Sequence, residues 1–124
     1  MKLGVGGFGT VFKRVLGDGR VVAIKKSNKG VDPTQLLNEL EIMMQILNHK
    51  NIVRFLGCFL ETEEPLLVYE YVSNGDVMEN LWEGNNCVMN WEQCLKVARQ
   101  TAEAFAYLHG TYPASRCKVF KCAT

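Results

Sequence analysis

The chain has 124 residues, of which 48% are hydrophobic and 22% are charged, and its formal net charge is +1. This length holds one domain at most, and the charge gives no basic excess of the kind that marks nucleic-acid binding. No apolar run approaches the roughly 18 residues of a membrane span, the start is not a signal peptide, and the five cysteines lack a C-x-x-C zinc pattern, so we expect a cytoplasmic protein with reduced thiols.

A glycine-rich segment begins the chain, with the form G-x-G-x-x-G-x-V at Gly4, Gly6, Gly9 and Val11. Glycine lacks a Cβ, so the backbone can turn sharply and its N–H groups can approach phosphate oxygens. Glycines also gather in ordinary hairpins, and a dinucleotide-binding fold uses the same spacing but needs a helix directly afterwards. Because β-branched residues follow instead, we expect a hairpin of strands at 2–6 and 10–16.

The third expected strand, 20–26, carries the residues V-A-I-K at 22–25. A helix over 32–47 should follow, because Asp32 can cap it and Pro33 suits its first position. Its expected buried face consists of apolar residues at helical spacing: Leu36, Leu40, Met43, Met44 and Leu47.

Two further strands, 53–60 and 66–72, flank an acidic turn. The second is apolar on both faces, which favours an interior position in the sheet. Asp76 and Glu79 resemble a capping box for a short helix over 76–82, and a loop is expected over 83–89.

A long helix is expected over 90–109, capped by Asn90 and ended by Gly110. Apolar residues at helical spacing predict its buried stripe: Trp91, Leu95, Ala98, Ala102, Phe105 and Leu108. Beyond residue 110 the apolar residues follow no clear helical or strand periodicity.

These motifs in order resemble a protein kinase, specifically the plant receptor-like kinases near the wall-associated group. The matching stretches are LGVGGFGTVFK (3–13), DGRVVAIKK (18–26), NELEIM (38–43), NHKNIVRFLGCFLE (48–61), PLLVYEYVSNG (65–75) and AYLH (106–109). The resemblance implies an α+β fold in which a five-stranded antiparallel sheet packs on the 32–47 helix. Residues 1–72 would form the small lobe, 73–109 the start of a large lobe, and 110–124 a divergent tail.

The resemblance also implies an ATP site. Lys25 matches the lysine that holds the α- and β-phosphates, and Glu39 matches the helix glutamate that pairs with it, which makes these two the expected catalytic residues. Tyr69 resembles the gatekeeper at the back of the pocket. The expected cofactor-binding residues are Leu3, Gly4, Val5, Gly6, Gly7, Phe8, Gly9, Val11, Ala23, Lys25, Tyr69, the hinge residues Glu70 and Val72, and Asp76 near the ribose.

Each role has a plainer alternative. Lys25 and Lys26 are both compatible with solvated strand lysines. Glu39 competes with Glu41, but the two are two positions apart and so point to different sides of a helix. Asp76 is as compatible with a helix cap as with a ribose ligand.

The family's H-R-D catalytic loop, D-F-G and A-P-E motifs do not occur in the sequence, and its last aspartate is Asp76. A truncated gene, a retained intron or a shifted reading frame would each give such a chain. We expect no metal ligands here, although Mg²⁺ accompanies ATP in the family. The stripe on the long helix should lack its usual cover.

The resemblance and the missing motifs together lead to two alternative functions. The first is the ATP-binding part of a serine/threonine protein kinase, acting on protein hydroxyls at the cytoplasmic face of the plasma membrane and inactive as this chain. The alternative is a non-catalytic fragment that binds nucleotide or a kinase partner, or a product without function.

Overall fold

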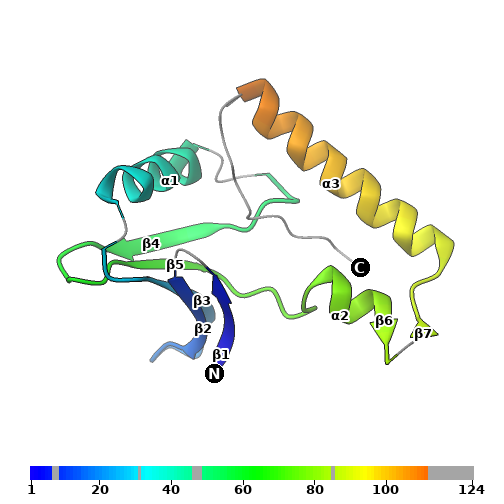
Figure 1. Cartoon of the computed structure of the whole chain (residues 1–124), viewed down its shortest axis with the longest axis horizontal. Coiled ribbons are helices and arrows are strands. Elements are labelled where there is room, and N and C mark those ends of the chain that lie inside the picture. Colours follow the sequence, from blue (N-terminus) through cyan, green and yellow to red (C-terminus); the bar gives the residue numbers. More distant parts are fainter. Residues whose placement is uncertain (7–8, 31, 46–48, 85, 112–124) are drawn as a thin grey trace. The chain divides into compact units, whose positions relative to one another are not determined.

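The computed structural model describes residues 1–6, 9–30, 32–45, 49–84 and 86–111, and they form two compact units (Figure 1). The first unit comprises Met1–Asn48 and Arg54–Tyr71, and the second His49–Val53 and Val72–Thr124. The first contains β1 (Lys2–Gly6), β2 (Gly9–Val15), β3 (Val21–Ser27), α1 (Pro33–Gln45), β4 (Phe55–Phe59) and β5 (Leu66–Glu70). The second contains α2 (Val77–Leu81), β6 (Trp82–Glu83), β7 (Asn86–Cys87) and α3 (Trp91–Thr111).

The five strands of the first unit form one antiparallel sheet in the order β1-β2-β3-β5-β4, which confirms the predicted α+β fold. β5 lies between β3 and β4, as its apolar character predicted. Strand ends differ from the predictions by one or two residues. β5 ends at Glu70 rather than at residue 72, and backbone hydrogen bonding there ends with the Glu70 N–H donating to the Arg54 carbonyl at 2.8 Å.

The strand register gives the sheet two chemically different faces. Val11 lies opposite Lys25, and Ala23 lies opposite Tyr69. Directly paired residues in antiparallel strands point to the same side, and successive residues alternate. Val11, Ala23, Lys25 and Tyr69 therefore share one face, which we call the inner face.

Helix α1 begins as predicted, because the Asp32 carboxylate accepts a hydrogen bond from the Thr34 N–H at 2.9 Å. Leu40 and Met43 are its buried side chains in the described part of the helix, at 7% and 1% exposure. Met44 was predicted on the same face but is 65% exposed. It follows Met43 directly and is therefore turned about 100° around the helix axis. Leu47 lies outside the described residues.

Both helices of the second unit begin with a capping box. Asp76 and Glu79 exchange hydrogen bonds at the start of α2, as predicted. Asn90 and Gln93 exchange them at the start of α3, at 2.8 and 2.9 Å. The loop expected over 83–89 is wrong, since β6 and β7 pair there as a small hairpin. Two-residue strands are too short to show a periodic pattern in the sequence.

The segment 49–53 is attached to α3. The His49 ring lies 4.8 Å from the Tyr107 ring, and Lys50 lies 3.9 Å from the Glu103 carboxylate. The His49 Nδ1 accepts a hydrogen bond from the Asn51 N–H at 3.1 Å, which fixes the turn after α1.

The buried side of α3 differs from the predicted stripe. Gln100, Ala104 and Leu108 are buried, whereas Trp91, Leu95 and Phe105 are 76%, 51% and 42% exposed. Of the predicted stripe, only Leu108 is therefore buried in the described structure. Gly110 does not end the helix, because α3 continues to Thr111 and Gly110 does not adopt a positive φ.

We expect the exposed stripe to make the 124-residue polypeptide self-associate, because burying apolar surface stabilises contacts by about 25 cal/mol per Å². Leu95→Glu combined with Phe105→Lys should reduce the weight-average mass measured by light scattering. Lys96→Gln, on the same helix but off the stripe, is the control. A sharp monomer for the unmodified chain would contradict the prediction.

Candidate functional site

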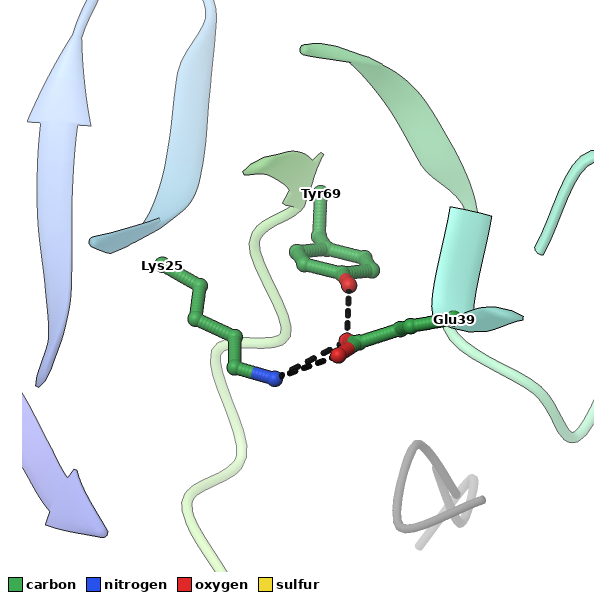
Figure 2. A network of polar contacts seen from close by, with 3 residues as sticks. All are labelled: Lys25, Glu39 and Tyr69. Carbon is green, nitrogen blue, oxygen red and sulfur yellow. Dashed lines mark hydrogen bonds and ion pairs between the residues drawn. The ribbon is translucent and has the colours of Figure 1, made fainter. Parts of the chain in front are cut away.

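An ion pair occupies the inner face of the sheet. The Lys25 Nζ on β3 donates hydrogen bonds to both carboxylate oxygens of Glu39 on α1, each at 2.9 Å (Figure 2). Both side chains are more than two-thirds buried. The pairing expected between these two residues is therefore present, and a lysine ammonium is held at a defined place on the sheet.

Tyr69 completes a three-residue network. Its hydroxyl donates a hydrogen bond to the Glu39 Oε1 at 2.6 Å, and Figure 2 shows the tyrosine and the lysine reaching the carboxylate from different directions. Tyr69 is 5% exposed, and the Phe55 ring of β4 meets its ring edge-on with centroids 5.6 Å apart. Sequence reasoning placed Tyr69 in the pocket but missed this hydrogen bond, because no local pattern links residues 30 positions apart.

The competing lysine, Lys26, points to the opposite face of the sheet. There it pairs with Glu64 beside an open hollow. The hydrogen bond from Lys26 lowers the pKa of the Glu64 carboxyl below its usual value, and Glu64 is partly exposed on the β4–β5 turn. Glu41, the alternative to Glu39, is exposed. Of the two lysines, Lys26 is therefore the one that forms an ordinary solvent-exposed ion pair.

We expect Glu39→Gln to reduce any nucleotide affinity several-fold, because it removes the charge that orients Lys25. Glu41→Gln should leave the affinity unchanged, since Glu41 lies outside the network. Isothermal titration with ATP compares the two variants. Equal losses in both would mean that Glu39 has no special role.

The glycines of the first segment differ in whether a neighbouring atom leaves room for a side chain. A Cβ on Gly9 would lie 2.1 Å from the Lys26 carbonyl oxygen, so β3 itself requires glycine there. A Cβ on Gly4 would meet nothing within 4 Å, and one on Gly6 would meet only the Gly9 carbonyl at 4.0 Å. Neither Gly4 nor Gly6 adopts a positive φ. Gly7 and Phe8 lie outside the described residues.

The apolar residues expected around adenine are placed on the same strands. Val11 and Ala23 are half-buried on the inner face. Leu3 and Val5 on β1 are exposed. Val11 lies directly opposite Lys25, whereas β2 separates Leu3 and Val5 from the strand that carries Lys25.

Residues at the end of β5 and just after it make hydrogen-bond and ring contacts with other strands and loops of the first unit. The Glu70 carboxylate accepts a hydrogen bond from the Arg54 N–H at 2.8 Å, and the Glu70 N–H is bonded to the Arg54 carbonyl. The Lys13 ammonium lies 4.6 Å from the centre of the Tyr71 ring. This last contact was missed by sequence reasoning, because Lys13 on β2 and Tyr71 after β5 are far apart in the sequence and β3 lies between the two strands.

Val72 and Asp76 belong to the second unit, and their roles toward a nucleotide stay predictions. Asp76 is the N-cap of α2, and its carboxylate accepts a hydrogen bond from the Glu79 N–H at 2.8 Å.

No cluster of three potential metal ligands occurs among the described residues. Within the same part of the chain, no helix is long and apolar enough to cross a membrane.

Comparison with known proteins gives consistent matches. The sequence profile of the family described as protein tyrosine and serine/threonine kinase matches residues 1–112. Wall-associated receptor kinase-like 3 of Arabidopsis thaliana is 50% identical over 111 residues, covering 86% of this chain and 15% of that protein. Wall-associated receptor kinase 1 of the same plant is 46% identical over 112 residues, covering 88% of this chain and 15% of that protein.

A solved structure, the pseudokinase domain of BIR2, an immune regulator of the RLK/Pelle family, superposes with a TM-score of 0.69 at 28% identity. The match covers 87% of this chain and 33% of that one. The chain thus spans about one seventh of the length of the curated relatives cited above.

Proposed function

The chain belongs to the protein tyrosine and serine/threonine kinase family, with receptor-like wall-associated kinases among its relatives, and we propose that its residues 1–72 bind ATP. The observation that carries the proposal is the Lys25–Glu39 ion pair on the inner face of the sheet, beside the glycine segment. Lys25 would hold the α- and β-phosphates, and Glu39 would orient Lys25.

The geometry at Lys25 supports a phosphate contact. An ammonium group has three N–H donors, and two are directed at the Glu39 oxygens. One donor remains for a phosphate oxygen. Since Glu39 bonds to both Lys25 and Tyr69, the lysine is held in place before any ligand arrives.

The glycines at positions 4 and 6 support the same ligand. No neighbouring atom and no positive φ requires glycine at either position. A close approach of an external group to the backbone does require it, because a Cβ would fill that space. Gly4 also lies opposite Val11, which in turn lies opposite Lys25, so Gly4 and Lys25 lie in the same cross-strand row with Val11 between them.

The finer roles belong to this proposal as well. Leu3, Val11 and Ala23 would contact adenine, Tyr69 would close the back of the pocket, and Glu70 would offer its backbone carbonyl since its N–H is bonded to Arg54. Residues 73–109 would begin a large lobe, with Val72 and Asp76 completing the site. Transfer of the ATP γ-phosphate to serine or threonine hydroxyls, at the cytoplasmic face of the plasma membrane, would belong to a polypeptide that also carries H-R-D and D-F-G.

Thermal-shift titration tests the proposal. A ligand that binds only the folded state raises the melting temperature by mass action. ATP and an adenine-site kinase inhibitor should each stabilise the chain, with ATP acting only at high concentration, because the sequence holds no D-F-G aspartate to bind the metal. No shift with either ligand on demonstrably folded protein would contradict ATP binding.

A second candidate is a non-catalytic module that binds a kinase partner. The exposed stripe on α3 supports it, since large exposed apolar patches mark interaction surfaces. The solved relative is itself described as a pseudokinase. Co-purification with a kinase domain that is lost on combining Leu95→Glu with Phe105→Lys, but not on Lys25→Met, would favour this function.

A further inference from the structure

We propose that the face of the sheet opposite Lys25 carries a docking site for an extended acidic peptide of a partner protein, in which an apolar side chain lies between two carboxylates. The site is a hollow of about 540 Å³, which we call the outer hollow. Because the Lys25–Glu39 pair lies on the inner face, this inference goes beyond the proposed ATP site and does not rest on it.

The floor of the outer hollow is apolar. Phe12 lies opposite Ile24 in the β2–β3 pairing, and Leu66 lies opposite Lys26 in the β3–β5 pairing. Since successive residues of a strand alternate between faces, Phe12, Ile24 and Leu66 all lie on the face opposite Lys25. The three side chains are half-buried and line the hollow, and no described residue of α1 lines it. The floor therefore offers apolar surface to a ligand.

Cations surround this floor and are only partly neutralised. Arg14, Lys26 and Lys29 line the hollow, and the β4–β5 turn adds two carboxylates. Lys26 pairs with Glu64, whereas Lys29 comes only to within 3.9 Å of Glu63, and these last two side chains are 75% and 89% exposed. Arg14 is exposed and forms no ion pair with any residue that the structure describes. The hollow keeps an excess of positive charge, which an acidic ligand complements.

The spacing of these groups defines the form of the ligand. Arg14 lies opposite Val22, and Lys26 lies four residues further along β3 with Ile24 between them. In an extended chain four residues span about 13 Å, and the residues at positions i, i+2 and i+4 point to the same side. A peptide running along β3 can therefore place one carboxylate at Arg14, an apolar side chain over Ile24, and a second carboxylate at the end that carries Lys26 and Lys29.

Two features favour a peptide over a polyanion such as a nucleic acid. Glu63 and Glu64 lie at the rim of the hollow, and they would repel a continuous row of phosphates. A peptide with two separated carboxylates avoids this repulsion. The apolar floor also needs an apolar group in the ligand, which a phosphate backbone does not supply.

Fluorescence anisotropy with the full chain and a labelled, end-capped peptide of sequence E-S-F-S-E tests the proposal. We expect saturable binding that weakens as salt is added, because salt screens interactions between exposed charges. The matched peptides are E-E-F-S-S, which has the same composition without the spacing, and E-S-S-S-E, which lacks the apolar side chain. Both should bind several-fold more weakly than E-S-F-S-E.

Variants of the chain locate the binding site. Arg14→Gln should weaken the binding of E-S-F-S-E about threefold to fivefold, the effect of losing one exposed ion pair. Arg20→Gln is the matched control, because Arg20 carries the same charge between β2 and β3 but pairs with Asp18 and does not line the hollow. Arg14→Glu should reverse the preference, so that either K-S-F-S-E or E-S-F-S-K binds better than E-S-F-S-E. A purely structural role of Arg14 would not produce this exchange.

Three results would overturn the proposal: no saturable binding of E-S-F-S-E to a chain that circular dichroism shows to be folded, equal affinity for the three peptides, or equal losses in Arg14→Gln and Arg20→Gln. Binding should persist when Leu95→Glu is combined with Phe105→Lys. Its loss in that variant would place the peptide on α3 instead of in the outer hollow. None of these measurements uses nucleotide, so failure of ATP binding and failure of peptide docking are told apart.

Discussion

Replacing Lys25 with methionine is expected to weaken ATP binding by at least about tenfold, since a hydrogen bond to a charged group contributes roughly 1.5–3 kcal/mol. Methionine keeps much of the apolar stem and removes the ammonium group. Glu39 keeps an acceptor for the Tyr69 hydroxyl in this variant, so the hydrogen bond between α1 and β5 is expected to remain. The loss should therefore come from the phosphate contact more than from unfolding.

Lys26→Met is the matched control for this experiment. Lys26 is the next residue on β3, but it is exposed on the opposite face, where it pairs with the partly exposed Glu64. Exposed ion pairs contribute little to stability. We expect its ATP affinity, measured by isothermal titration, to equal that of the unmodified chain.

An equal loss of affinity in Lys25→Met and Lys26→Met would contradict the assignment of the inner face as the ligand face. A normal affinity in Lys25→Met would contradict the phosphate role of Lys25 itself. Circular dichroism melting of both variants shows whether each is folded, so a loss caused by unfolding is recognised directly.

The parts of the site that the sequence predicted are those held by local chemistry. V-A-I-K on a strand places Lys25 and Lys26 on opposite faces, because side chains alternate along a strand. Asp32 was predicted to cap the start of α1, and it does. Glu39 was chosen over Glu41 because N-E-L at 38–40 resembles the kinase motif, and Glu39 is the residue that pairs with Lys25. Residue type and spacing gave the elements and the strand alternation, whereas the choice of Lys25 and Glu39 came from the resemblance to the kinase motifs.

The parts that were missed depend on contacts between distant segments. The Tyr69–Glu39 hydrogen bond joins β5 to α1, and the Lys13–Tyr71 contact joins β2 to the end of β5. Neither leaves a periodic signal. The buried side of α3 was wrong for a related reason: its stripe of large apolar residues is exposed, while Gln100 and Ala104 are buried on the other side. The spacing of apolar residues identifies which face of a helix is apolar, but it does not show whether another element packs against that face.

The 124-residue polypeptide is expected not to transfer phosphate. In protein kinases, metal ions bridge the phosphates and the aspartate of the catalytic loop receives the proton of the substrate hydroxyl. Lys25 and Glu39 can orient ATP but can supply neither a metal site nor that base. The sequence holds no H-R-D or D-F-G, and its last aspartate, Asp76, is bonded as the cap of α2.

No later carboxylate takes over these roles in the described structure. Glu79 is engaged in the capping box of α2, and Glu103 lies beside Lys50 and Arg99. Glu83 and Glu92 are exposed on β6 and at the start of α3. No three potential metal ligands come together within the described ranges.

The expected deficit is large because two contributions are lost together. Losing one preorganised electrostatic group typically costs about 100- to 1000-fold in rate, and here both the base and the metal site are missing. Incubation with γ-labelled ATP, Mg²⁺ and a generic basic protein should give no incorporation above the Lys25→Met control, either into that protein or into the chain itself. Incorporation by the unmodified chain that disappears in Lys25→Met would overturn the prediction, since it would show that residues outside the family's motifs supply the base and hold the metal.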